Sequence, residues 1–305
     1  MATRNSTIVR AYKGASYATV RGSFRLLERV APALGARWAE RIWFTIPPAA
    51  TPRIAAPDGS SAFEVAVDGH RVRGRRWGEG DPVYLVHGWG GSASQLDAFV
   101  PPLVQAGFSV VSFDTPSHGA SDPGPSGPRS STILEAAEAL RAVAARHGDP
   151  AGVVGHSAGA TAAAVALRDG LPATRAVFLA PMADPRPYAD WFAARLGFGE
   201  RTRVRLLARI ERRVGVPIAY LDVPAMAGQA AMPPLLVVHD QGDRETSWSG
   251  GRDIANAWPD ARLLTTSRLG HRRILRDPGV VAEVVGFLAG ATPSREQAAA
   301  GEVAS

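Results

Sequence analysis

The sequence contains no cysteine and only one lysine, and both shortages bear on chemistry. Without cysteine there can be no disulfide, thiolate zinc site, iron–sulfur cluster or cysteine nucleophile. The single lysine, Lys13, lies in a polar stretch that has no glycine-rich loop. Schiff-base enzymes and P-loop nucleotidases need a lysine in the site, so both classes are strongly disfavoured.

Long apolar runs are also missing. No run approaches the roughly 18 residues that a membrane-spanning helix needs. The basic N-terminus lacks the apolar segment of about 7–15 residues that marks a secretory signal peptide. With 46% hydrophobic and 20% charged residues, the composition is that of a globular protein with a large core. We expect a cytoplasmic protein, with membrane association left open.

The net charge of +6 is concentrated at one end of the chain. Residues 1–55 hold nine basic and two acidic residues, whereas the remainder holds 25 basic and 26 acidic ones. A pI near 10.4 would suggest a nucleic-acid partner if the basic residues were spread over the whole protein. Because most of the chain is neutral, we expect no nucleic-acid partner.

The basic N-terminal region is predicted to be helical over residues 15–46. Pro32 and Gly35 are expected to divide it into two helices, and residues 49–61 are expected to form a linker. The favoured interpretation is an apolar stripe that packs on the main domain or on a partner subunit, and the alternative is a basic amphipathic helix on an anionic membrane. The stripe recurs at spacings of three and four and consists of Phe24, Leu27, Ala31, Leu34, Trp38 and Ile42.

From residue 62 onward, short apolar runs alternate with helical stretches. Residues 62–67 and 71–77 alternate around Asp68-Gly69 and predict a hairpin. The alternation that follows predicts a mostly parallel, twisted sheet with helices on both faces. The predicted parallel strands are 83–86, 109–113, 152–155, 175–179, 235–238 and 261–264. The predicted helices cover about 93–106, 131–147, 158–169, 251–257 and 278–289.

One strand-to-helix junction has the pattern G-x-S-x-G, from Gly155 to Gly159. In such a turn the strained backbone exposes the central serine at the end of a strand, and the glycines relieve crowding. Ser157 also lies at a helix N-terminus, which favours developing negative charge. Because the pattern follows an apolar strand and opens an alanine-rich helix, we interpret Ser157 as a nucleophile rather than part of a simple turn.

These motifs resemble the α/β-hydrolase fold superfamily, in its serine hydrolase and esterase-like branch, over residues 62–290. The other motifs that carry the resemblance follow the family's order: Leu85-Val86-His87-Gly88-Trp89-Gly90-Gly91, Phe113-Asp114-Thr115-Pro116-Ser117-His118-Gly119-Ala120-Ser121, Val237-Val238-His239-Asp240-Gln241-Gly242-Asp243 and Leu269-Gly270-His271. The second departs from the family at Ser117, which replaces the usual glycine. A serine at the elbow argues against the dehalogenase and epoxide-hydrolase branches.

The resemblance implies a catalytic triad of Ser157, His271 and Asp243. The serine needs an imidazole to take its proton, and the imidazole needs a carboxylate to fix its tautomer. Asp243 lies at the family's offset, Asp240 is the fallback, and Asp222 is a remote third option. The other histidines lie in strand-end motifs, on a hairpin or at element ends, where they would shape loops or pack in the core: His70, His87, His118, His147, His156 and His239.

The resemblance also implies an oxyanion hole and a cap. The hole would use the backbone N–H groups of Ala158 and Trp89. A helical cap insertion is expected at 181–233, within a core of 62–180 and 234–290, after an N-terminal extension of 1–61. Residues 291–305 are expected to be a disordered tail. Either core packing or an apolar acyl pocket would suit Trp191, Phe192, Phe198, Tyr220, Met226 and Met232.

The sequence thus predicts a serine hydrolase that cleaves a small-molecule carboxylic ester without a metal or cofactor. An amidase, peptidase, thioesterase or acyltransferase with the same triad remains an alternative, because fold does not determine the bond that is cleaved. A non-catalytic binding module on the same scaffold is a further alternative. Residues 15–46 are expected to supply any peripheral membrane or homo-oligomer contact.

Overall fold

The computed structural model describes residues 17–47 and 56–290. Lys13, the predicted tail at 291–305 and most of the predicted linker at 49–61 lie outside the described residues.

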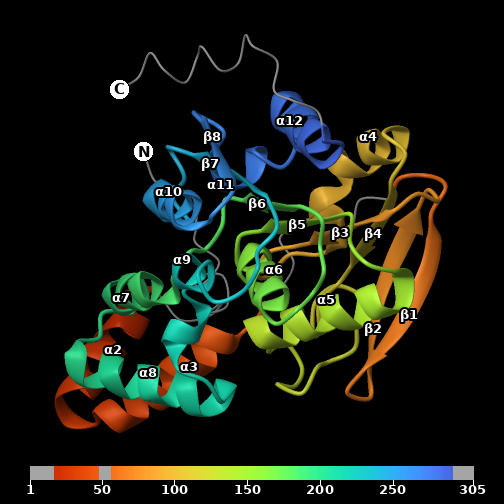
Figure 1. Ribbon diagram of the computed structural model, residues 1–305. Helices are drawn as coiled ribbons and strands as arrows, with labels where there is room; N and C mark the ends of the chain where they lie inside the picture. The colour runs from red at the N-terminus through yellow and green to blue at the C-terminus, as the bar shows by residue number, and fades with distance from the viewer. Residues whose placement is uncertain (1–16, 48–55, 291–305) are drawn as a thin grey trace, which may run out of the picture.

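Within the described residues, eight strands form one sheet at the centre of the molecule (Figure 1). Its order is β1-β2-β4-β3-β5-β6-β7-β8. β1 and β2 form the predicted hairpin, β2 is antiparallel to β4, and all later neighbours are parallel. The predicted α/β fold is therefore confirmed. The strands are β1 (Ser61–Val67), β2 (His70–Trp77), β3 (Pro82–Val86), β4 (Ser109–Phe113), β5 (Gly152–His156), β6 (Ala176–Leu179), β7 (Leu235–Asp240) and β8 (Ala261–Thr266).

β3 to β7 are buried along their whole length, because helices cover both faces of the sheet. α5 (Ile133–His147), α6 (Ala158–Arg168) and α10 (Trp248–Ala257) pack on one face. The 3₁₀ helix η1 (Ala93–Phe99), α4 (Val100–Gln105) and α12 (Pro278–Leu288) pack on the other. The remaining elements of this part are the short helices η2 (Ile218–Leu221), α9 (Val223–Met226) and α11 (Gly270–Arg273).

The strand order reverses next to β3. The chain moves from β3 to β4 on one side and then crosses through α5 to β5 on the other side. In open α/β sheets, ligands bind beyond the carboxyl ends of the strands at such a point. Here the segment after β3 contains His87-Gly88-Trp89, and the residue after β5 is Ser157. The topology therefore brings two of the predicted motifs together.

Four further helices form a group, called here the helical layer, beside the carboxyl ends of the strands (Figure 1). Two come from the N-terminal region, α2 (Tyr17–Val30) and α3 (Pro32–Phe44), and two from the insertion, α7 (Pro185–Leu196) and α8 (Glu200–Val214). They share one apolar cluster. The N-terminal stripe thus packs on the inserted helices of its own chain.

Polar contacts also join the two halves of the helical layer. The Glu28 carboxylate accepts the backbone N–H groups of Arg201 and Thr202 at 3.0 and 3.1 Å, at the first turn of α8. These donors have no partner within their own helix, so Glu28 caps α8 from another helix. Glu40 forms an ion pair with Arg209. Segments about 170 positions apart in the sequence are therefore held together.

Two details of the N-terminal prediction were wrong. The helix break lies at Ala31, with Pro32 in the first turn of α3, whereas Gly35 lies inside that helix. A side chain at Gly35 would come within 3.2 Å of the Thr202 hydroxyl, so the glycine permits close helix packing. Leu34, assigned to the packed stripe, is exposed.

No helix among residues 17–47 and 56–290 has the length and apolar character needed to cross a membrane.

Candidate active site

Ser157 occupies the sharp turn between β5 and α6. Its φ of 54° and ψ of −121° are uncommon for a residue with a side chain. The flanking glycines are required by packing. A Cβ at Gly155 would lie 2.6 Å from the Ala160 Cα, and one at Gly159 would lie 2.4 Å from the Val86 carbonyl oxygen. The G-x-S-x-G pattern therefore corresponds to a strained turn between β5 and α6.

The predicted acid and base meet in the structure. Nδ1 of His271 lies 2.8 Å from Oδ2 of Asp243, and both side chains are buried. Burial alone would raise the pKa of Asp243, but hydrogen bonds from His239 and His271 hold it well below its usual range. The carboxylate is therefore an anion that can fix the orientation of His271.

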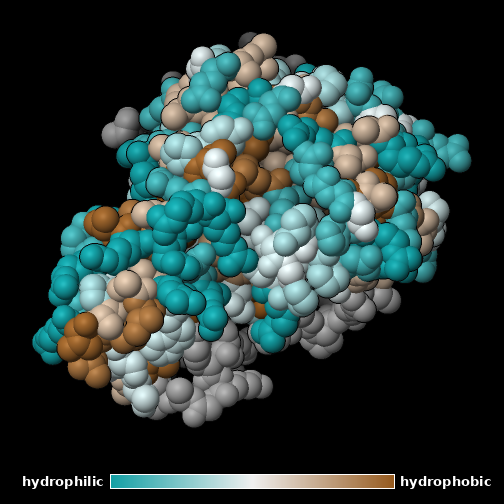
Figure 2. Space-filling view, turned by 90° about the horizontal axis from the view of Figure 1, so that it is seen from below, coloured by the Kyte–Doolittle hydropathy of each residue, from teal (hydrophilic) through white to brown (hydrophobic). Residues whose placement is uncertain are grey.

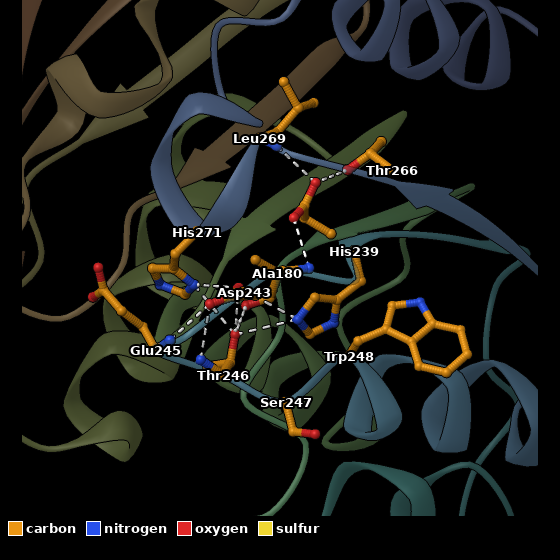
Figure 3. A network of polar contacts seen from close by, with 12 residues as sticks. Ala180, His239, Asp243, Glu245, Thr246, Ser247, Trp248, Thr266, Leu269 and His271 are labelled. Carbon is orange, nitrogen blue, oxygen red and sulfur yellow. Dashed lines mark hydrogen bonds and ion pairs between the residues drawn. The ribbon is translucent and has the colours of Figure 1, made fainter. Parts of the chain in front are cut away.

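Thr246 stands at the centre of the polar network around this pair (Figure 3). Its hydroxyl lies 3.0 Å from Oδ2 of Asp243, 3.2 Å from Nδ1 of His271 and 3.2 Å from the carbonyl oxygen of Ala180. Its backbone N–H and that of Glu245 donate to Oδ1 of Asp243 at 3.1 and 2.8 Å. Both carboxylate oxygens are thus satisfied. Thr246 has no signal in the sequence, because only the folded loop brings its hydroxyl to the carboxylate.

Asp240 performs a different task from Asp243. Its Oδ2 accepts hydrogen bonds from the Leu269 N–H and the Thr266 hydroxyl, each at 2.9 Å, and Oδ1 accepts the Gly242 N–H at 2.9 Å. Burial raises the pKa of Asp240, but these hydrogen bonds bring it below the ordinary value. Asp240 therefore ties the end of β7 to the loop that precedes His271.

Asp222, the third option for the acid, lies elsewhere. Its Oδ1 caps α9 by accepting the N–H of Ala225, and its other oxygen pairs with Arg186. The structure brings only Asp243, among the three carboxylates considered, to His271.

His87 and His118 shape the loop that carries Trp89, as predicted from their motifs. Nε2 of His87 accepts the Thr115 N–H at 3.0 Å, so its Nδ1 carries the proton and donates to the Gly88 carbonyl at 2.8 Å. Nε2 of His118 accepts the Gly90 N–H at 3.2 Å.

Both loop histidines are neutral. Burial lowers the pKa of His87, and it lowers the pKa of His118 to about 3. A neutral imidazole can accept a hydrogen bond, which the charged form cannot. The two rings therefore serve as acceptors that fix the backbone on either side of Trp89.

Trp89 and Ala158, the predicted oxyanion-hole residues, line the same pocket as Ser157 and His271. The Gly90 N–H is engaged by His118, and the Gly91 N–H donates to the Gly88 carbonyl at 3.0 Å. Among the described residues, neither the N–H of Trp89 nor that of Ala158 has a hydrogen-bond acceptor. These two donors are free to bind a ligand oxygen.

His156 holds the backbone of His271. Its ring lies 4.6 Å from the His271 ring, and its Nε2 donates to the His271 carbonyl at 3.1 Å. Burial lowers the pKa of His156 well below its ordinary value, so the ring is neutral. The hydrogen bond from His156 therefore helps to fix the position of His271.

The helical layer supplies most of the apolar wall of the pocket. α3 contributes Ile42, Trp43 and Phe44, which no sequence motif links to the site. Burial raises the pKa of Tyr188, another lining residue, to about 12, so its hydroxyl remains neutral. The other apolar lining residues of the insertion are Met182, Pro185, Phe192, Ile210, Val214, Ile218 and Leu221.

The six residues considered for an acyl pocket mostly lie elsewhere. Phe192 lines the pocket. Trp191 is exposed and Phe198 is buried within the helical layer. The other three belong to, or pack against, the apolar core on the face of the sheet that α5, α6 and α10 cover: Tyr220, Met226 and Met232.

No group of three or more histidine, aspartate or glutamate side chains that could hold a metal ion occurs among residues 17–47 and 56–290.

Comparison with known proteins shows the family to which the chain belongs. The model of a family described as the alpha/beta hydrolase family matches residues 83–284. The chain belongs to the alpha/beta hydrolase family. The match begins in β3 and ends in α12, so it includes both the motif-bearing strands and the insertion.

A curated relative is the dihydrolipoyllysine-residue acetyltransferase component of the acetoin cleaving system of Cupriavidus necator. It is 31% identical over 175 residues, which cover 56% of this chain and 44% of that protein. Curated relatives of this alpha/beta hydrolase are matched over 22% to 52% of their own length.

Solved structures share the fold. A bacterial membrane phospholipase A has a TM-score of 0.58 and 17% identity, with 90% of this chain and 92% of that chain covered. An esterase from Exiguobacterium antarcticum has a TM-score of 0.56 and 16% identity, with 74% of this chain and 98% of that chain covered. At this identity the likeness is one of fold.

Proposed function

We propose that this alpha/beta hydrolase is a serine hydrolase that cleaves a carboxylic ester through an acyl-enzyme. One observation carries the proposal. The strained Ser157 shares its pocket with His271, whose Nδ1 lies 2.8 Å from the buried carboxylate of Asp243. This combination supplies a nucleophile, a base and an orienting anion.

The proposed reaction follows from these positions. Oγ of Ser157 attacks the carbonyl carbon, and its proton passes to Nε2 of His271, because Nδ1 is engaged by Asp243. The Asp243 anion stabilises the resulting imidazolium. The N–H groups of Trp89 and Ala158 bind the oxygen that becomes negative, where such donors are worth about 10²–10³ in rate.

Collapse of the tetrahedral intermediate completes the first half of the reaction. The carbon–oxygen bond to the alcohol breaks, and His271 gives its proton to the departing oxygen. Water then attacks the acyl-enzyme while His271 takes a proton from it. The second tetrahedral intermediate releases the carboxylic acid and restores the Ser157 hydroxyl.

The walls of the pocket favour an apolar acyl group. Side chains such as Ile42, Phe192 and Val214 offer hydrocarbon contacts to a chain that extends from the Ser157 carbonyl position. A bound chain of this kind would displace water from the pocket.

The triad alone does not select the bond. The curated relatives include an acetyltransferase component and a non-heme haloperoxidase. The bond that is cleaved and the acyl acceptor therefore have to be determined by experiment. A panel of ester, thioester and anilide substrates with matched acyl groups separates these reactions. We expect the largest kcat/KM for the esters. A larger value for anilides or thioesters would change the assignment of the bond.

A fluorophosphonate probe tests the nucleophile. We expect the parent protein to be labelled and Ser157→Ala not to be labelled. Ser61→Ala is a matched control, because Ser61 is exposed on the edge strand β1, and it should be labelled like the parent. Equal labelling of the parent and Ser157→Ala would overturn the proposal. Absence of any acyl-enzyme mass shift across the panel would favour a binding module.

A further inference from the structure

Three large apolar side chains are exposed at the corner where α2 meets α3. Leu26, Val30 and Leu34 are 59%, 69% and 56% exposed, respectively. The first two lie one turn apart on α2, and the N–H of Leu34 donates to the carbonyl of Ala31 across the turn. Figure 2 looks onto this side, and apolar residues gather at the lower left, where the helical layer ends. These three residues are called the apolar corner.

The apolar corner is not part of the packing of the helical layer. The inward side of α2 is occupied by Phe24, whose ring stacks on Trp38 at a centroid distance of 4.4 Å and is fully buried. Single exposed apolar residues are common on protein surfaces, whereas a group of large ones marks a contact site.

Exposed arginines lie on the same two helices as the apolar corner. Arg25 and Arg29 lie beside it on α2, and Arg37 and Arg41 follow Leu34 on α3. All four are exposed, and none forms an ion pair with a carboxylate in the part of the chain that the structure describes. Their positive charge is therefore not neutralised by the protein itself.

The acidic residues nearby are already engaged. Glu28 caps α8, and Glu40 pairs with Arg209. Together α2 and α3 contain five arginines and two glutamates. The two helices that carry the apolar corner are therefore basic.

We propose that the apolar corner and its arginines bind an anionic lipid surface. The three side chains would enter the boundary between headgroups and acyl chains, and the guanidinium groups would contact lipid phosphates, to which their planar donors are suited. A second copy of the chain fits less well, because a two-fold contact through this corner would bring unpaired arginines of both copies together.

Vesicle sedimentation with the full chain tests the proposal. We expect binding to vesicles of phosphatidylcholine with phosphatidylglycerol, weaker binding to phosphatidylcholine alone, and weakening by salt. Arg29→Gln/Arg37→Gln should reduce the partition coefficient by about thirty-fold, since each arginine near an anionic surface contributes roughly a factor of five. Leu26→Ser/Val30→Ser should reduce it on the order of tenfold or more.

The controls separate this surface from general charge and from folding. Arg146→Gln removes an exposed arginine at the end of α5, far along the chain from the helical layer, and should bind vesicles like the parent. All variants should keep the parent melting temperature, because the changed side chains are exposed. Labelling of Ser157 by the fluorophosphonate probe in solution should also be unchanged. A failure of the membrane proposal can therefore be distinguished from a failure of the proposed hydrolase function.

Three outcomes would overturn the proposal. The first is no sedimentation of the parent with anionic vesicles. The second is equal binding by the parent and both double variants. The third is a concentration-dependent dimer that Leu26→Ser/Val30→Ser dissociates, without vesicle binding, which would assign the apolar corner to a second copy.

Discussion

Nε2 of His239 lies 3.4 Å from Oδ2 of Asp243. The same oxygen is 2.8 Å from Nδ1 of His271, so one buried carboxylate serves two imidazoles. Nδ1 of His239 has no hydrogen-bond partner among the described residues, which leaves Nε2 as the nitrogen that carries the proton. His239 is therefore placed to act on the proposed reaction through Asp243, as a positioning residue.

Replacing His239 with leucine removes one of the donors that keep the Asp243 carboxyl ionised. The effect of burial is then opposed by fewer hydrogen bonds, so the pKa of Asp243 rises in the folded state. We expect the acid limb of kcat/KM to move to higher pH. His239→Gln, which keeps an N–H donor, should restore part of the shift. An unchanged pH profile in His239→Leu would show that the histidine only fills space.

The same substitution should alter how stability depends on pH. A carboxyl whose pKa is lowered by folding contributes its full stability above the unfolded value of about 4, and this contribution is lost as the pH falls below that value. In His239→Leu the contribution shrinks. Urea unfolding should therefore show a lower stability at pH 7 than in the parent, and the decline on acidification should level off at a higher pH, because the folded-state pKa of Asp243 is higher in the variant. A decline that continues to equally low pH in both proteins would contradict the role given to His239.

Asp243→Asn should reduce kcat by about 10⁴, since an amide does not hold the histidine in the productive tautomer. Asp240→Asn is the comparison, because Asp240 contacts Leu269, Thr266 and Gly242. It should lower the melting temperature while kcat falls far less. Equal losses of kcat in the two folded variants would remove the distinction between the two carboxylates.

A larger side chain at Ile42 should shorten the space for the acyl chain. Ile42 lines the pocket from α3, and a tryptophan there would occupy the path of a long chain. In a series of nitrophenyl esters, Ile42→Trp should shift the preferred chain to a shorter length. Leu34→Trp alters the exposed part of the same helix and should leave the preference unchanged. The same preference in Ile42→Trp and the parent would place the acyl chain elsewhere.

Removal of the Glu28 carboxylate should loosen the helical layer. Two N–H groups of α8 would lose their acceptor, and loss of a helix cap typically costs about 1 kcal/mol. We expect Glu28→Ala to lower the free energy of unfolding in urea by that amount. Glu138→Ala, which breaks a half-buried pair with Arg141 within one turn of α5, should cost about 0.5 kcal/mol or less. Similar costs in both variants would argue against the cap.

The sheet and the motif residues could be predicted because their signals are local. Each buried strand is a short apolar run, and Ser157 lies between glycines that only a tight turn requires. Asp243 and His271 follow strand ends in the family's order. The fold then brings them together through the parallel arrangement of β5, β7 and β8.

The walls of the pocket could not be predicted, because they depend on contacts between distant segments. Trp191 and Phe192 are neighbours in the sequence, yet one is exposed and the other is buried against the pocket. Only the orientation of α7 against α3 decides between them. The contribution of Ile42 likewise arises from packing across about 170 positions and has no local signal.

The position of α3 has a consequence for synthesis of the protein. α2 and α3 leave the ribosome before α7 and α8, their packing partners, which lie more than 140 residues later in the chain. At about 5–20 residues per second, the apolar side of the N-terminal helices stays uncovered on the order of ten seconds. During that interval the uncovered apolar faces of α2 and α3 are prone to aggregate, and the pocket is completed only after the insertion has been made.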